Sequence, residues 1–170
     1  KLYDELIHVP LVVDVPGTEG RRIEQQVGLD DMPPTVTDLM DIDSPDGWQG
    51  ESLTPSIVDG ESPVDKPVVS VTVRGEEVTT QPIPRALSDG ELLVSARDRD
   101  WTYIENVDDG STELYHRPSD PTQQDDLSEA PTTEEQQVLD RFSAVVEDHV
   151  SLLHNRAEEQ GDDNVDDDLG

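Results

Sequence analysis

ELLVSARDRDWTYIENVDDGSTELYHR, residues 91–117, holds three runs of strand-forming residues joined by short polar links. The runs at 91–97, 101–107 and 111–117 are rich in aliphatic, aromatic and β-branched side chains, which favour extended backbone. Links as short and polar as RDRD and DDG are typical of β-hairpins. The stretch therefore predicts three antiparallel strands. The alternating run VVSVTV at 68–73 predicts a fourth strand in the same small sheet.

A long amphipathic helix is predicted after the sheet. Thr132 precedes Glu135 by three residues, which is the spacing of a capping box. Apolar residues then recur every three or four positions, as they do on one face of a helix. These residues are Val138, Phe142, Val145, His149 and Leu152 or Leu153. We expect this helix, about 20 residues long, to cover one face of the sheet.

The first part of the chain has a different character. VPLVVDV at 9–15 is almost continuously apolar and predicts an inner strand covered on both faces. Asp31 is a good helix N-cap, and the two prolines after it fit the first turn of a helix. Residues 44–67 are rich in Gly, Pro, Ser and Asp and predict an extended loop with one short helical turn.

The charge of the chain has two possible explanations. The formal net charge is -30, from 41 acidic and 11 basic residues. Low hydropathy with high net charge is typical of disorder. It is also typical of a folded protein adapted to multimolar salt, which screens the repulsion between its carboxylates. Because the acidic residues are spread between apolar runs, we favour salt adaptation, and expect disorder only in the acidic tail at 156–170.

The composition also argues against several classes of partner and site. A charge of this sign disfavours nucleic acids and anionic membrane surfaces, which attract Lys and Arg. No apolar run approaches the roughly 18 residues that span a bilayer. There is no cysteine, and the four histidines have no paired spacing, so we expect no metal site in these residues. A start missing before residue 1 would hide any signal peptide, so the location stays open, and we favour the cytoplasm of a high-salt organism.

Three segments, in this order, carry a family resemblance. They are KLYDELIHVPLVV from residue 1, VGLDDMPPTVTDLMDIDSPDGWQGESL from residue 27 and ELYHRPSDPTQQDDL from residue 113. Together they resemble the sulfatases of the alkaline-phosphatase-like superfamily. The matching residues in the second segment are Asp31, Pro34, Thr35, Leu39, Ile42, Gly50, Ser52 and Leu53. Those in the third segment are Glu113, Leu114, Tyr115, Asp120, Pro121 and Leu127.

The resemblance implies an α/β fold and a division of the chain. The chain is expected to be a C-terminal fragment of a sulfatase, with a small antiparallel sheet of about four strands packed by a C-terminal helix. Residues 1–43 would form the end of the catalytic α/β domain, and 44–67 a loop bordering the cleft. Residues 68–155 would form the sheet and helix, and 156–170 the acidic tail. An N-terminal catalytic portion is then expected as a partner.

The resemblance also implies an activity, the hydrolysis of sulfate esters of small molecules or glycans. Such enzymes use a formylglycine and a divalent cation such as Ca²⁺, but neither the nucleophile motif nor the metal ligands occur in this chain. The chain by itself is therefore expected to be inactive. Lys1 is the candidate for the family's sulfate-contacting lysine, although it lies closer to Tyr3 than that lysine usually does.

Two further residues have expected roles, and two alternative functions stay open. Trp48 either lines a substrate pocket or only pins the long loop, and His8 is expected to be structural. One alternative is another branch of the same superfamily that cleaves phosphodiesters or phosphonate esters or transfers phospho-groups. The other is a non-catalytic acidic module that binds cations or a partner protein. The fragment hypothesis, unlike this module, predicts an exposed apolar face around residues 9–13.

Overall fold

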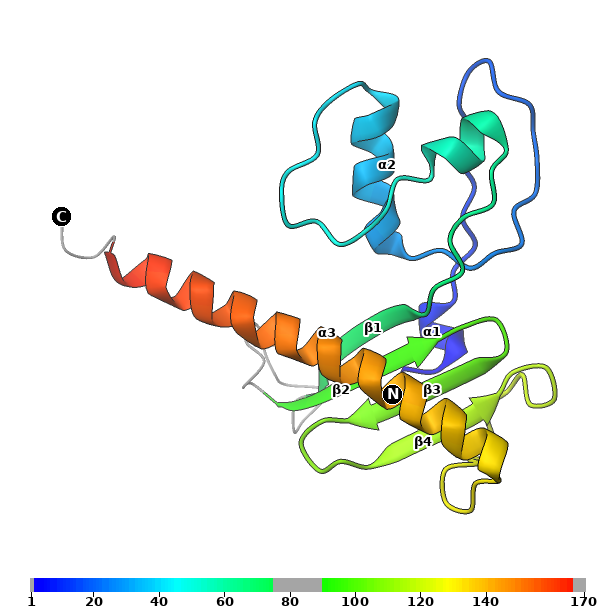
Figure 1. Cartoon of the computed structure of the whole chain (residues 1–170), viewed down its shortest axis with the longest axis vertical. Coiled ribbons are helices and arrows are strands. Elements are labelled where there is room, and N and C mark those ends of the chain that lie inside the picture. Colours follow the sequence, from blue (N-terminus) through cyan, green and yellow to red (C-terminus); the bar gives the residue numbers. More distant parts are fainter. Residues whose placement is uncertain (1, 75–89, 167–170) are drawn as a thin grey trace. The chain divides into compact units, whose positions relative to one another are not determined.

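The computed structural model describes residues 2–74 and 90–166, with side chains up to residue 157. The elements are α1 (Asp4–Ile7), η1 (Leu29–Asp31), α2 (Met32–Leu39), η2 (Pro55–Asp59), β1 (Val68–Arg74), β2 (Glu91–Arg97), β3 (Trp101–Asn106), β4 (Thr112–His116) and α3 (Thr133–Asp166) (Figure 1). They belong to two compact units. One is formed by Lys1–Tyr3 with Val69–Gly170 and the other by Asp4–Val68.

The sheet confirms the predicted strands. Its order is β1-β2-β3-β4, so each strand lies beside the next one in sequence. The last three strands are antiparallel, with Ala96 opposite Tyr103 and Tyr103 opposite Leu114. The short links after β2 and β3 thus form the two hairpins expected from RDRD and DDG.

Helix α3 lies across one face of this sheet and closes its core (Figure 1). The sheet contributes Val94, Ala96, Tyr103 and Leu114, and the helix contributes Leu139, Phe142 and Val146, all buried. The rings of Tyr103 and Phe142 stack with their centroids 6.2 Å apart. The buried stripe of the helix centres on Leu139, Phe142 and Val146, whereas the expected Val138 and Val145 flank it and are partly buried.

The end of α3 corrects one expectation. The helix continues to Asp166, so the prediction of a disordered tail was wrong for residues 156–166. The first part of this extension has a local reason, because the stretch RAEEQ at 156–160 consists of residues with high helix propensity. The remaining predicted tail, residues 167–170, lies outside the described residues. No described helix is long and apolar enough to cross a membrane.

In the unit Asp4–Val68, the prediction of a strand at residues 9–15 was wrong. Residues 9–15 form no strand. A strand requires a neighbour that takes its backbone hydrogen bonds, and none is provided by the described residues. The expected exposed apolar face is confirmed, since Val9, Leu11, Val12 and Val13 are 52%, 41%, 91% and 39% exposed. The helix predicted after Asp31 is present as α2, and the short helical turn predicted in the loop is present as η2.

Candidate functional site

The three residues singled out from the sequence are Lys1, Trp48 and Asp31. Lys1 lies outside the described residues, so its proposed contact with sulfate stays a prediction. Trp48 lies in the loop after α2 and is 44% exposed, and its place in a cleft wall also stays a prediction. Asp31, in contrast, is 2% exposed and is the centre of a hydrogen-bonded cluster.

Asp31 occupies the N-cap position of α2, but its side chain makes no capping hydrogen bond to that helix. The backbone N–H of Gly28 donates to Oδ2 at 2.9 Å, and that of Glu51 donates to Oδ1 at 2.8 Å. The Lys66 ammonium lies 3.3 Å from Oδ1. A buried carboxylate needs such partners, because an unpaired buried charge is strongly unfavourable. Asp31 therefore joins three segments, a role that an N-cap pattern does not predict.

The residues around Asp31 explain why the second resembling segment has its particular composition. The Thr35 hydroxyl donates to the carbonyl oxygen of Asp31 at 2.5 Å and accepts from the N–H of Leu53 at 2.8 Å. A Cβ at Gly50 would lie only 1.7 Å from the carbonyl oxygen of Asp30, so only glycine fits there. These motif residues hold the loop 44–67 against α2.

The third resembling segment meets the first at a cluster of two tyrosines and a glutamate. The hydroxyls of Tyr3 and Tyr115 both donate to Glu113 Oε2, at 3.1 Å and 2.7 Å. The two rings meet edge to face, with centroids 6.1 Å apart. Burial, followed by the hydrogen bond to Glu113, raises the pKa of Tyr115 well above its ordinary value. We call this the Tyr3–Glu113–Tyr115 cluster.

The rest of that segment fixes the connection from β4 to α3. The Asp120 carboxylate accepts the N–H groups of Gln124 and Asp125 at 2.8 Å and 2.9 Å. The Leu127 N–H donates to the carbonyl oxygen of Leu114 at 2.9 Å, and Leu127 packs against the core. Each of these residues has a structural role in the fold. The motif therefore indicates the fold rather than a reacting group.

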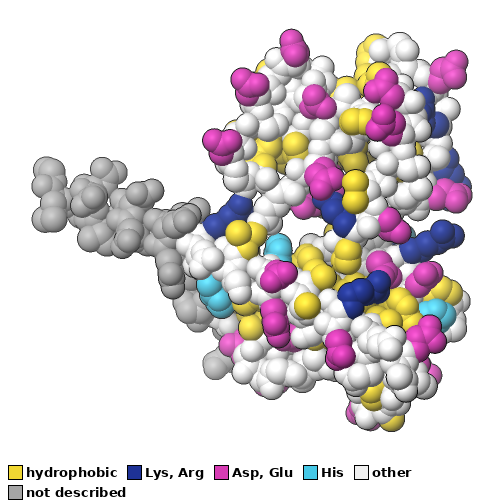
Figure 2. All heavy atoms as spheres, viewed as in Figure 1, with side chains coloured by type: hydrophobic (Ala, Val, Ile, Leu, Met, Phe, Trp, Pro, Cys, Tyr) yellow, Lys and Arg dark blue, Asp and Glu magenta, His cyan; other side chains and the backbone are white. Residues whose placement is uncertain are grey.

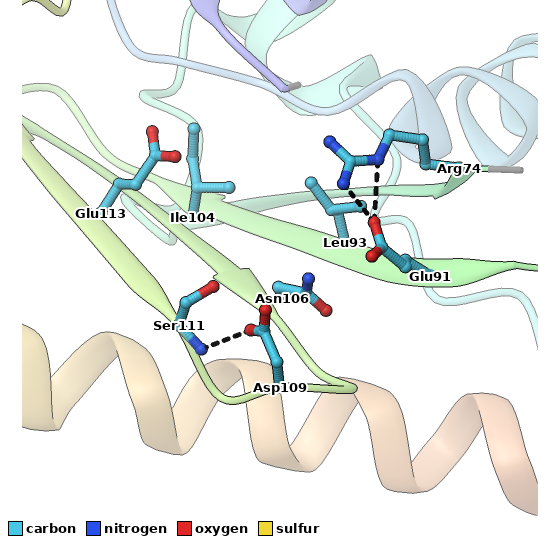
Figure 3. A pocket seen from close by; sticks show the side chains of 8 residues that line it. All are labelled: Arg74, Glu91, Leu93, Ile104, Asn106, Asp109, Ser111 and Glu113. Carbon is cyan, nitrogen blue, oxygen red and sulfur yellow. Dashed lines mark hydrogen bonds and ion pairs between the residues drawn. The ribbon is translucent and has the colours of Figure 1, made fainter. Parts of the chain in front are cut away.

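A hollow of about 190 Å³ lies on the sheet. It was not foreseen from the sequence, because its lining comes from four segments that only the sheet brings together. The lining residues are Arg74, Glu91, Leu93, Ile104, Asn106, Asp109, Ser111 and Glu113 (Figure 3). Leu93 alternates with the core residues Leu92 and Val94, so it lies on the sheet face opposite α3.

Two pairs of polar residues in the hollow are bonded to each other (Figure 3). Arg74 forms an ion pair with Glu91, its Nε donating to Oε2 at 2.9 Å. The N–H of Ser111 donates to Asp109 Oδ1 at 2.8 Å, and the Ser111 hydroxyl and this N–H lower the pKa of Asp109. The lining contains a serine but no histidine to activate it as a nucleophile.

The cofactors implied by the resemblance do not fit these residues. In the described part of the chain, no group of three or more His, Asp or Glu side chains is placed to hold a metal ion. The sequence contains no cysteine that could become formylglycine.

Comparison with known proteins identifies the fold. No family model matches the sequence, and no curated protein matches it. Solved structures do match. A phosphonate monoester hydrolase from Silicibacter pomeroyi is 23% identical, with a TM-score of 0.63 over 80% of this chain and 27% of that one. This chain has the fold of a part of the alkaline-phosphatase-like sulfatases.

Two sulfate-related structures show the same sulfatase fold. A 2-O GAG sulfatase is 21% identical, with a TM-score of 0.52 over 71% of this chain and 24% of that one. A protein bound to its substrate D-glucosamine-2-N,6-O-disulfate is 20% identical, with a TM-score of 0.54 over 74% of this chain and 24% of that one. The chain thus spans about a quarter of the length of the structures it matches, which include both sulfatases and phosphonate monoester hydrolases.

Proposed function

We propose that this chain is the C-terminal part of a sulfatase-type hydrolase that cleaves sulfate esters of small molecules or glycans. The supporting observation is the fold match, which covers 71–80% of the chain and includes a sulfatase of glycosaminoglycans. The contact between Tyr3 and Glu113 agrees with it, because it joins two of the segments that resemble sulfatases.

The proposal assigns limited chemistry to these residues. Lys1 would place a cation against a sulfate oxygen, where it would stabilise the charge that develops during cleavage. Trp48 would line the cleft. The divalent cation and the formylglycine would belong to a catalytic portion outside these residues, since the described part of the chain holds no ligand set for a metal.

A second candidate is the hydrolysis of phosphonate monoesters. The observation that favours it is the TM-score of 0.63 with the Silicibacter pomeroyi enzyme, against 0.52 and 0.54 with the two sulfate-related structures. Sulfate and phosphonate esters pass through transition states of similar shape but different charge, and the fold of this part does not distinguish them.

The test is an assay of the complete gene product with nitrophenyl sulfate and with a nitrophenyl phosphonate monoester, in molar KCl. We expect sulfate release from the first at a rate well above the second, and no turnover by the 170-residue chain alone. Faster cleavage of the phosphonate would favour the second candidate. Cleavage of neither would favour a non-catalytic acidic module that binds cations or a protein.

A further inference from the structure

The first residues of the chain are attached to the small sheet, although the residues that follow them are not. Lys1–Tyr3 belong to the same compact unit as the sheet and α3, whereas Asp4–Val68 form the other unit. Leu2 is 6% exposed, so it is almost fully buried. The Tyr3 hydroxyl donates to Glu113 Oε2, 110 residues later in the sequence. Tertiary contacts therefore hold the first residues on the sheet, since the covalent route between these two positions is so long.

Glu113 and Tyr115 hold Tyr3 on the sheet face opposite α3. Leu114 lies between them in β4 and belongs to the core under α3. Side chains alternate along a strand, so those of Glu113 and Tyr115 point to the other face. Glu113 Oε2 accepts both tyrosine hydroxyls, and the two rings meet edge to face. A carboxylate acceptor strengthens such bonds, and the ring contact restrains the direction of Tyr3 as well as its place.

Lys1 is only two residues away from this anchored tyrosine. Two residues span at most about 7 Å, so the anchor limits where the Lys1 backbone can lie. The lysine side chain beyond it is a flexible four-carbon stem, which contributes little restraint of its own. The restraint that the sheet places on Lys1 therefore passes through Leu2 and Tyr3.

We infer that Glu113, together with Tyr115, is a positioning residue that holds Tyr3 and thereby directs Lys1 toward the sulfate group of the substrate. This inference rests on the proposed function, because the contact between Lys1 and sulfate belongs to that proposal. A cation stabilises developing charge only where it is held close to the reacting oxygen. A displacement of about 1 Å can lower a rate by about 100-fold, so an anchor two residues away affects the reaction.

Variants of the complete gene product test this inference through sulfate binding and turnover. Titration calorimetry with sodium sulfate in molar KCl measures the dissociation constant of sulfate, and nitrophenyl sulfate gives kcat/KM. We expect Lys1→Ala to weaken sulfate binding and to lower kcat/KM by about 100-fold. Glu113→Gln should change both quantities in the same direction, by about tenfold. Tyr3→Phe should behave like Glu113→Gln, because it removes the same hydrogen bond.

A double-mutant cycle separates positioning from an effect on the fold alone. In the Lys1→Ala background, Glu113→Gln should change sulfate binding and kcat/KM by less than about twofold, because no cation is left to position. Equal losses in the two backgrounds would show that Glu113 acts only on the fold, and would overturn the inference. If Lys1→Ala lost sulfate binding and Glu113→Gln kept it, the inference would fail and the proposed function would stand.

Glu105→Gln is the matched control. Glu105 also accepts a hydrogen bond from a tyrosine two residues away in its strand, the hydroxyl of Tyr103, at 2.6 Å. Tyr103 belongs to the core under α3, so this pair lies on the other face of the sheet. Glu105→Gln should therefore leave sulfate binding and kcat/KM within about twofold of the unmodified product. If the unmodified product neither bound sulfate nor cleaved the ester, the proposed function would fail and this inference with it.

Discussion

Gly50 shows at the scale of one residue how the loop 44–67 is held. A methyl group there would meet the carbonyl oxygen of Asp30, a backbone atom that cannot rotate away. We expect Gly50→Ala to lower the free energy of unfolding by about 3 kcal/mol, as overpacking does in crowded sites. Urea denaturation followed by tryptophan fluorescence measures this change.

Gly20→Ala is the matched control for that variant. No atom lies within 4 Å of the position of its Cβ. The same substitution should therefore leave stability unchanged or raise it by about 0.5 kcal/mol, through a less flexible unfolded chain. If Gly50→Ala and Gly20→Ala behaved alike, the close approach of Gly50 to Asp30 would not matter in solution.

The Tyr3–Glu113–Tyr115 cluster gives a second prediction at this scale. Tyr115→Phe removes a hydrogen bond to a carboxylate and should cost about 2 kcal/mol of stability, and Tyr3→Phe about 1 kcal/mol. A double-mutant cycle with Glu113→Gln measures the coupling. In the Glu113→Gln background, Tyr3→Phe should cost clearly less than in the unmodified chain. Additive losses would show that Tyr3 and Glu113 do not interact.

The raised pKa values of Tyr115 and Tyr103 predict how the stability of the fold depends on pH. The pKa of Tyr115 is raised in the folded state by burial and by Glu113, and that of Tyr103 is raised by burial and by Glu105. The unfolded chain therefore loses these protons first, at its ordinary pKa of about 10. The stabilisation is complete below that pH and falls as the pH rises above it. Unfolding free energies measured from neutral to alkaline pH should decline above about pH 10, with tyrosinate absorbance appearing as the protein unfolds.

Helix α3 shows at the scale of an element how local signals determine structure. Its capping box is present, because the Thr132 N–H donates to Glu135 Oε2 at 2.6 Å and the Glu135 N–H donates to the Thr132 hydroxyl at 3.3 Å. Thr132→Ala should therefore cost about 1 kcal/mol of stability. Thr133→Ala, one position further on, removes no cap and should change stability by less than about 0.5 kcal/mol. Thermal unfolding of the two variants by circular dichroism tests this difference.

Elements that are determined by residues close together in the sequence could be predicted from the sequence. Strands β2, β3 and β4 follow from alternating side chains and short links, and α3 follows from its cap and apolar repeat. The run at 9–15 could not be predicted in the same way, because a strand exists only beside a partner. The described residues form no strand beside it, and its aliphatic side chains stay largely exposed.

The candidate sites were less predictable, because their residues come from distant parts of the sequence. Asp31 follows a good helix-start pattern, but its partners Glu51 and Lys66 lie 20 and 35 residues away in sequence. Nothing in the local pattern predicts these contacts. The hollow beside Arg74 likewise combines residues from four segments. Long-range contacts of this kind follow from the fold and not from periodicity.

The charge of -30 acts on the molecule as a whole. Acidic side chains are spread over the face seen in Figure 2, so their mutual repulsion is distributed rather than confined to one patch. The Debye length falls from about 10 Å at 0.1 M salt to about 3 Å at 1 M salt, which removes most of this repulsion. We therefore expect the Tm to rise steadily as KCl is raised from 0.1 M to about 2 M. The measurement is a series of thermal melts, with equal osmolality of sucrose as the control for exclusion effects. A Tm independent of KCl would rule out the proposed adaptation to salt.

The bond between Tyr3 and Glu113 joins positions 110 residues apart, and this separation sets an order of events during synthesis. The hairpins of the sheet close through neighbours and form quickly, whereas a closure over so long a loop is slow. A ribosome adding about 10 residues each second makes Tyr3 roughly ten seconds before Glu113. The hydrogen bond of Tyr3 can therefore form only after Glu113 has been made. Tyr3 is thus among the last residues of the sheet unit to become ordered.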